Sequence, residues 1–211
     1  MTKLQRITDE LLAEKGIDTD ADRGKKQTAL DEITPEVMEQ LTPEDITEHT
    51  SSFYNENVDY YIKKSHSQGI IDELVNFMNS LSDGARVLDV GCGPGRDTLF
   101  MSIPDKEYRK TQMTREKNGK SMLERGIEVP SNSFRVVGID RSLEMIEAAT
   151  FAKIRAAKEG FLEDMSKARF VLADMHTIRP WDGEFDAVWS CTALFTHTPR
   201  SLSEQSLQNV S

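Results

Sequence analysis

Cysteine is nearly absent from the sequence, which has only Cys92 and Cys191 among its 211 residues. Two cysteines cannot build the disulfide framework of a small secreted domain, so a reducing, cytoplasmic setting is expected. Long apolar runs are missing too, since no stretch approaches the roughly 18 residues of a membrane span. The N-terminal segment also lacks the continuous apolar stretch of a signal peptide. These absences predict a cytoplasmic protein with no membrane partner.

Positive charge is in deficit, because 26 Lys and Arg residues face 36 Asp and Glu residues, for a net charge of -10. A surface of this charge repels a phosphate backbone, so nucleic acid is not expected as a partner. Histidine is scarce as well, and His49, His66 and His176 show no metal-ligand spacing. The sequence therefore predicts no metal site.

Strand-like and helix-like segments alternate through the second half of the chain. One helix is expected from about Ser67 to Leu81 and a second directly after the glycines that follow residue 90. A third is expected from Ser142 to about Gly160. Strands separated by helices imply right-handed crossovers and a parallel sheet, whose ligands bind beyond the carboxyl ends of the strands. Four short apolar segments are expected to be the strands, at residues 86–90, 134–139, 170–173 and 185–190.

Two regions fall outside this alternation. Residues 1–52 are expected to form an acidic, helical or mobile extension before a core at 53–211. In that extension Thr34-Pro35-Glu36 and Thr42-Pro43-Glu44 each predict a helix start, because threonine caps a helix and proline fits its first position. Residues 101–133 are long and charged, which indicates an insertion that forms a mobile loop or a small lid.

Three glycines, Gly91, Gly93 and Gly95, stand in the stretch RVLDVGCGPGRDTL at residues 86–99. A dinucleotide loop has the pattern G-x-G-x-x-G, but here Arg96 occupies the third-glycine position, and no Walker-type Lys-Ser/Thr follows. Asp89, just before the loop, would repel a pyrophosphate and suits a ligand with an ammonium group. The loop therefore favours a zwitterionic ligand over a nucleotide phosphate.

Four segments, VLDVGCGPGRDT, VVGIDRSLEMIEAA, FVLADMHTI and FDAVWSCTALFTHTP, resemble the successive motifs of class I S-adenosylmethionine-dependent methyltransferases. The resemblance covers residues 53–200 and implies an α/β, Rossmann-like fold, with a mainly parallel sheet and flanking helices. The family's sheet has seven strands, whereas this chain ends at Ser211, soon after the fourth. The resemblance therefore implies that the C-terminal strands are missing from a truncated chain, and that the fourth strand is an exposed edge.

The resemblance assigns a role in binding S-adenosyl-L-methionine to the first two motifs. The backbone of Gly91, Cys92 and Gly93, with Gly95 after them, would pass against the methionine part of the cofactor. Asp89 would accept a hydrogen bond from its ammonium group, directly or through water. In the second motif, Asp140 would accept hydrogen bonds from both ribose hydroxyls, and Arg141 beside it would also contact the cofactor. Met145 would pack on the adenine.

The later motifs would complete the site. Asp174 would accept from the adenine amino group, the Met175 amide would meet the ring edge, and Ser190 would lie near the methyl group. His197 would orient a substrate or accept a proton, although a helix-cap or packing role is an alternative. Asp140 taken alone could likewise be a turn residue, but three aspartates at consecutive strand ends together favour a binding site.

The expected function is methyl transfer from S-adenosylmethionine to a small-molecule acceptor. One alternative is a truncated fragment that binds the cofactor without catalysis. Another is an interaction module that self-associates through its exposed fourth strand. An NAD-dependent oxidoreductase is a third, disfavoured by Asp89 and Arg96.

Overall fold

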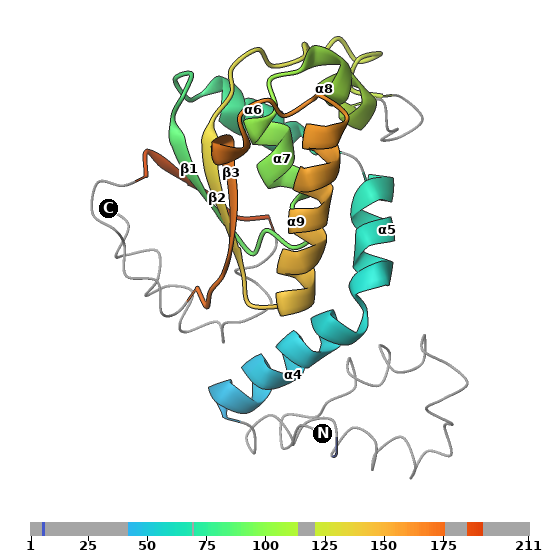
Figure 1. Ribbon diagram of the computed structural model, residues 1–211, viewed down its shortest axis with the longest axis vertical. Coiled ribbons are helices and arrows are strands. Elements are labelled where there is room, and N and C mark those ends of the chain that lie inside the picture. Colours follow the sequence, from blue (N-terminus) through green and yellow to red (C-terminus); the bar gives the residue numbers. More distant parts are fainter. Residues whose placement is uncertain (1–5, 7–41, 69, 114–120, 176–184, 192–211) are drawn as a thin grey trace. The chain divides into compact units, whose positions relative to one another are not determined.

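The computed structural model describes Arg6 and residues 42–68, 70–113, 121–175 and 185–191 (Figure 1). Contacts divide the chain into two units, of which one is Met1–Phe53 with Phe195–Ser211 and the other is Tyr54–Leu194. Within the described part of the chain, no helix has the length and apolar character needed to cross a membrane. The second unit carries the sheet and the candidate site.

Helix α4, Pro43–Glu56, begins at the second of the two expected helix starts. The Thr42 backbone N–H donates to Asp45 Oδ2 at 2.9 Å, and the Asp45 N–H donates to Thr42 Oγ1 at 3.1 Å. This reciprocal pair satisfies two N–H groups that the first helical turn leaves without partners. The start expected at Thr34 lies outside the described residues.

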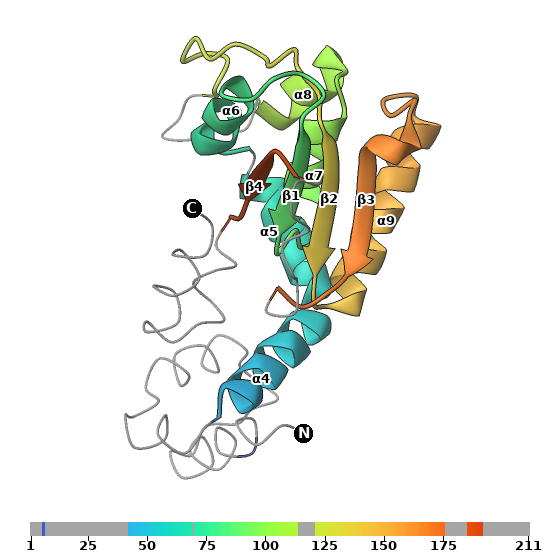
Figure 2. The same ribbon diagram turned by 90° about the vertical axis from the view of Figure 1, so that its left-hand side faces the viewer.

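The sheet has four parallel strands in the order β3-β2-β1-β4 (Figure 2). The expected parallel α/β fold is therefore confirmed. All four strands end at the same edge, because they run in the same direction. Their bounds are β1 Arg86–Val90, β2 Arg135–Asp140, β3 Ala168–Leu172 and β4 Ala187–Trp189.

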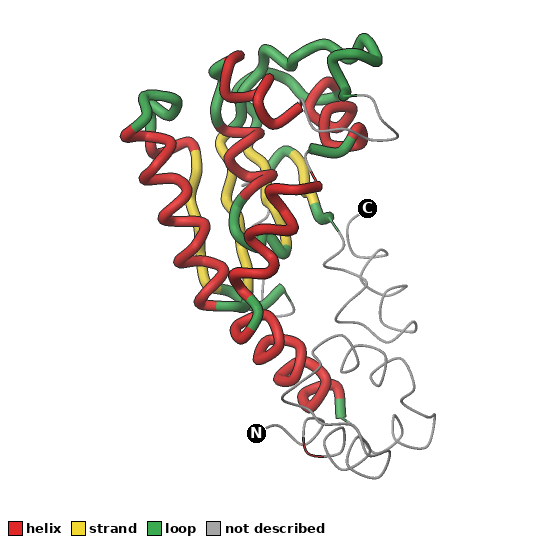
Figure 3. The backbone as a smooth tube through the Cα atoms, turned by 90° about the vertical axis from the view of Figure 1, so that its right-hand side faces the viewer, coloured by secondary structure: helices red, strands yellow, loops and turns green. Residues whose placement is uncertain are grey.

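Helices pack on one face of this sheet, as Figure 3 also shows. Helices α7 and α9 both contact β2 and β3, and α5 contacts α9. Side chains of α6, α7, β1 and β2 form the largest buried cluster, with Leu74, Phe100 and Val136 among its members. The bounds of these helices are α5 Val58–Gln68, α6 Asp72–Asn79, α7 Arg96–Ser102 and α9 Leu143–Lys158.

One expected helix is wrong. The single helix expected from Ser67 to Leu81 is two helices, because α5 ends at Gln68 and α6 begins at Asp72. Ile71 precedes α6 with an extended backbone, φ -94° and ψ 151°, which cannot continue a helix. The apolar stripe of α6 persists nonetheless, since Leu74, Val75 and Met78 are all buried.

The segment expected as an insertion contributes to the interior. It contains helix α8, Lys106–Met113, and a short turn around Met122. Met113 and Met122 are buried in the same cluster as Phe100. A role for this segment as a lid stays a prediction.

Candidate functional site at the carboxyl edge of the sheet

Polar residues gather where the parallel strands end. Asp89 is the fourth residue of β1, Asp140 is the last of β2, Asp174 comes two residues after β3, and Ser190 follows β4. The register pairs Asp89 with Gly138 of β2 and with Trp189 of β4. The expected site residues at these positions therefore share one edge of the sheet, except His197, which lies outside the described residues.

The glycine loop is a sharp turn between β1 and α7. Gly91, Gly93 and Gly95 have φ angles of 71°, 52° and 82°, a region that residues with a side chain rarely adopt. The N–H groups of Gly91 and Cys92 both donate to Ile139 O at 2.9 Å, which fixes the start of the loop to β2. The loop backbone is thus held beside the end of β2.

Gly93 and Gly95 are needed for different reasons. A Cβ added to Gly95 would lie 2.7 Å from Phe170 Cζ and 2.9 Å from Ala149 Cβ, so this glycine lets α7 begin close to β3 and α9. A Cβ added to Gly93 would meet no atom of the described residues within 4 Å. Gly93 therefore presents open backbone, as a loop that receives a ligand requires, whereas Gly95 serves packing.

Asp140 connects the end of β2 to the glycine loop. Its Oδ2 accepts from the Gly93 N–H and its Oδ1 from the Ser142 N–H, both at 2.9 Å. Ser142 in turn caps α9, because its Oγ accepts from the Met145 N–H at 3.1 Å. One carboxylate can accept several hydrogen bonds, so Asp140 holds the glycine loop and the residues at the start of α9 together.

Asp89 is a buried carboxyl, only 2% exposed, beneath the loop. Thr98 Oγ1 donates to its Oδ2 at 2.6 Å, and among the described residues Asp89 forms no salt bridge. Burial raises the pKa of Asp89 to about 8, and the nearby charge of Asp97 adds to the rise, while the Thr98 hydrogen bond opposes it. A cation placed here would favour the ionised carboxylate.

A second polar residue near Asp89 is Asp97, which the sequence motifs do not indicate. Asp97 accepts from Arg96 Nε at 2.7 Å and from Trp189 Nε1 at 3.1 Å. The contact with Trp189 joins the first turn of α7 to the end of β4. Polar residues in the buried first turn of α7, Asp97 and Thr98, are the sequence signal that could have indicated the group.

Around the end of β3, Arg141 and Asp174 are brought together. Arg141 Nη1 lies 3.4 Å from Asp174 Oδ2, and both side chains are partly exposed. Met175 packs against the cluster of Leu88, Val90 and Ile139. Arg141 thus places a positive charge beside the carboxylate expected to bind adenine.

Three other expected site residues have contacts within the protein. Met145 is 2% exposed, so its expected contact with adenine stays a prediction. Ser190 Oγ donates to Val90 O at 3.1 Å, which links β4 to β1 at the edge. Burial raises the pKa of the Cys92 thiol well above its usual range, which disfavours a thiolate there.

The chemistry of this edge fits a zwitterionic nucleoside better than a dinucleotide. Asp89 forms no salt bridge within the described ranges, and a cationic ligand group would stabilise its ionised form. Asp140 and Asp174 carry oxygens that can accept from hydroxyl and amino groups. Backbone at Gly93 is open to a neighbour. In the described part of the chain, no group of three or more His, Cys, Asp or Glu side chains could hold a metal ion.

Comparison with known proteins identifies one protein family. Residues 81–210 match the family described as a methyltransferase domain. A stretch of 59 residues is 37% identical to a probable S-adenosyl-L-methionine-dependent methyltransferase, TehB, of Haemophilus influenzae. That match covers 28% of this chain and 20% of the relative, so the chain spans about a fifth of the curated relative that it matches.

Solved structures that are similar to this chain have lower sequence identity. Magnesium protoporphyrin IX methyltransferase of Synechocystis PCC 6803, a structure with bound SAM, is 16% identical with a TM-score of 0.48. The match covers 77% of this chain and 68% of that one. A TehB-like SAM-dependent methyltransferase of Corynebacterium glutamicum is 20% identical with a TM-score of 0.42, covering 75% of this chain and 66% of that one.

Proposed function

The chain belongs to the methyltransferase domain family, the class I S-adenosylmethionine-dependent methyltransferases, and we propose that it methylates a small-molecule acceptor. The observation that carries the proposal is the buried Asp89 beneath an open glycine loop, on the same edge as Asp140 and Asp174. When bound, S-adenosylmethionine supplies a methyl group attached to a positively charged sulfur, which is a good leaving group.

Each residue of the edge would then have a separate binding role. Asp89 would accept from the ammonium group, and the ionised form would be stabilised by that charge. Asp140 would accept from the ribose hydroxyls while it continues to hold the Gly93 and Ser142 N–H groups. Asp174, held beside Arg141, would accept from the adenine amino group.

Catalysis would depend on position more than on proton transfer. Because the leaving group is already good, the chain's residues need chiefly to orient the two reactants and exclude water. The proposal of a small-molecule acceptor rests on the net charge of -10, which disfavours a nucleic-acid substrate. His197 is proposed to orient the acceptor or take its proton.

Calorimetric titration with S-adenosylhomocysteine tests the cofactor site. We expect a heat of binding, and absence of heat at millimolar ligand would overturn the proposal. We expect Asp140→Ala to weaken binding by about 1–3 kcal/mol, roughly five- to 150-fold, because it removes an acceptor from buried donors. An unchanged dissociation constant would contradict the ribose assignment.

Asp164→Ala is the matched control for that variant. Asp164 Oδ1 accepts from the N–H two residues later, that of Ser166, at 2.9 Å, as Asp140 Oδ1 does from Ser142. Asp164 lies just before β3, at the opposite edge of the sheet from the candidate site. Its loss should leave cofactor affinity unchanged.

A transfer assay tests the acceptor. The chain is incubated with methyl-labelled S-adenosylmethionine and an extract separated into small-molecule, protein and nucleic-acid fractions. We expect label in a small molecule other than the donor, and its loss with Asp140→Ala. Label confined to protein or nucleic acid would overturn the proposed acceptor class while leaving the cofactor site intact.

A further inference from the structure

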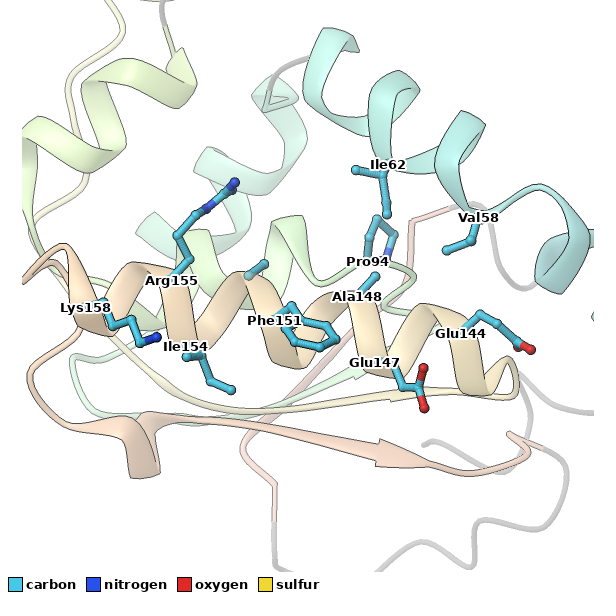
Figure 4. A pocket seen from close by; sticks show the side chains of 11 residues that line it. Val58, Ile62, Pro94, Glu144, Glu147, Ala148, Phe151, Ile154, Arg155 and Lys158 are labelled. Carbon is cyan, nitrogen blue, oxygen red and sulfur yellow. The ribbon is translucent and has the colours of Figure 1, made fainter.

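Helix α9 has an apolar strip on the side turned away from the sheet. Phe151 is 72% exposed and Ile154 is 38% exposed, although both are large apolar residues in the middle of the helix. They line a groove of about 670 Å³ between α9 and α5, whose other wall includes Val58, Ile62 and Pro94 (Figure 4). This groove lies along the outer side of α9 and reaches Pro94 of the glycine loop.

Charged side chains border the strip in a definite order. Glu144 and Glu147 precede Phe151, and Arg155 and Lys158 follow it, all lining the same groove. Residues spaced three and four apart lie on one side of a helix, so the five positions form a single stripe. Across the described ranges, none of the four charged residues forms a salt bridge. One carboxylate oxygen of Glu144, Oε2, is buried and has no hydrogen-bond partner within the described residues.

The order of charges in the stripe is complementary to that of a second stripe that runs in the opposite direction. Glu144 and Lys158 are equally far from Phe151 along the sequence, and so are Glu147 and Arg155. A two-fold axis through Phe151 would therefore set each acid opposite a base of a second, antiparallel α9. At 1.5 Å per residue, the pairs would lie about 6 and 10 Å from that axis on either side.

We propose that two copies of this chain associate through the stripe formed by Glu144, Glu147, Phe151, Arg155 and Lys158 of α9. The two Phe151 side chains meet at the axis, and each copy's groove receives the partner's α9. The contact is isologous, with four ion pairs arranged around an apolar centre. A single helix pair is small beside a standard interface, so the dimer is weak and forms at micromolar concentration.

The order of charge is the reason to choose a second copy over another occupant. The acid-to-base order complements the dipole of α9 itself, and it also makes two antiparallel copies complementary, whereas a wholly acidic or wholly basic partner would be repelled by half of the stripe. Strand β4 is the last strand at its side of the described sheet and Val188 on it is half exposed, so it offers a different surface for self-association. The variants below separate the two.

Sedimentation of the full chain over a range of concentrations tests the proposal. We expect a monomer–dimer equilibrium. We expect both E144K/E147R, which makes the stripe wholly basic, and R155E/K158E, which makes it wholly acidic, to raise the dissociation constant more than tenfold. An equimolar mixture of the two variants should restore a dimer, because one stripe then complements the other.

The mixture distinguishes loss of the interface from loss of folding. A variant that fails to dimerise because it is unfolded would not form a dimer when the other variant is added. The control E128K/E163R makes the same change of net charge at two exposed residues outside the stripe, and should dimerise like the parent chain. A parent chain that stays monomeric at every concentration, or a mixture without dimers, overturns the proposal. A dimer lost with Val188→Lys but kept in E144K/E147R would place the interface on β4 instead.

Discussion

A buried carboxyl such as Asp89 costs free energy when it is ionised, and that cost links the candidate site to pH. In the folded chain burial raises the pKa of Asp89 to about 8, whereas its ordinary value is 3.8. Between these values the folded chain binds a proton that the unfolded chain does not. The contribution of Asp89 to stability is therefore complete below about pH 4 and is lost as pH rises through about 8.

We expect Asp89→Asn to be more stable than the parent chain at pH 9, by at least about 1 kcal/mol, because the amide has no charge to bury. At pH 5 the two should differ much less, since Asp89 is protonated in the folded chain. Urea denaturation at both pH values measures the difference. A parent chain that is the more stable at pH 9 would contradict the account.

Binding of an ammonium ligand should release a proton from Asp89. At pH 7 the free chain holds Asp89 protonated, and an adjacent cation favours the ionised form. Titration with S-adenosylhomocysteine in two buffers of different ionisation enthalpy should give heats that differ by close to one proton per site. Asp89→Asn should bind more weakly and release none. Equal heats for the parent chain in both buffers would contradict this role.

At the scale of elements, the glycine loop is constrained by what packs beneath it. We expect Gly95→Ala to lower the free energy of unfolding by about 2–4 kcal/mol, because it combines a left-handed backbone, φ 82°, with contacts below 3 Å to Phe170 and Ala149. Urea denaturation measures the loss.

Gly126→Ala separates backbone strain from crowding. Gly126 has a similar φ of 79°, but its added Cβ would meet nothing within 4 Å in the part of the chain that the structure describes. We therefore expect a smaller loss, about 1–2 kcal/mol, from the backbone alone. Equal losses in the two variants would mean that Phe170 and Ala149 move aside freely.

Elements bordered by strong local signals could be predicted from the sequence. The apolar run before the glycines predicted β1 at 86–90, and Ser142 predicted the start of α9, since its hydroxyl caps that helix. Helix α8 could not be predicted because half of its residues are charged and few are apolar. Its buried face depends on Arg109, whose contacts lie with distant carbonyls, and no local pattern shows those.

Part of the candidate site could likewise be predicted from the sequence, and part of it could not. Strand ends placed Asp89, Asp140 and Asp174 on one edge, because parallel strands share a direction. The contact of Asp97 with Trp189 could not be predicted, since it joins residues 92 positions apart. The alternation of strands and helices in the sequence indicates the direction of the strands, whereas a side-chain contact between distant residues depends on the tertiary structure.

At the scale of the whole molecule, Arg109 ties the segment before β2 to α7. It is fully buried, and its guanidinium donates to four backbone carbonyls at 2.7–3.2 Å. Burial lowers its pKa to about 10. The carbonyls belong to Phe100, Met101, Pro130 and Asn132.

We expect Arg109→Met to cost about 3 kcal/mol or more, because it leaves buried carbonyls without donors. Hydrogen exchange should quicken in residues 121–134 before it does in β1. Arg125→Met is the control, since Arg125 pairs with Asp72 at 2.6 Å near the surface and a much smaller loss is expected. Uniformly faster exchange throughout the sheet would contradict a local role.

The position of β1 between β2 and β4 has a consequence for biosynthesis. The Arg86 N–H donates to Asp186, a residue 100 positions later, where β4 joins β1. At about 5–20 residues per second, a ribosome needs roughly 5–20 seconds to make the intervening chain. During that interval one side of β1 has no neighbour from its own chain, so the nascent protein passes through a stage in which chaperone capture competes with the arrival of its fourth strand.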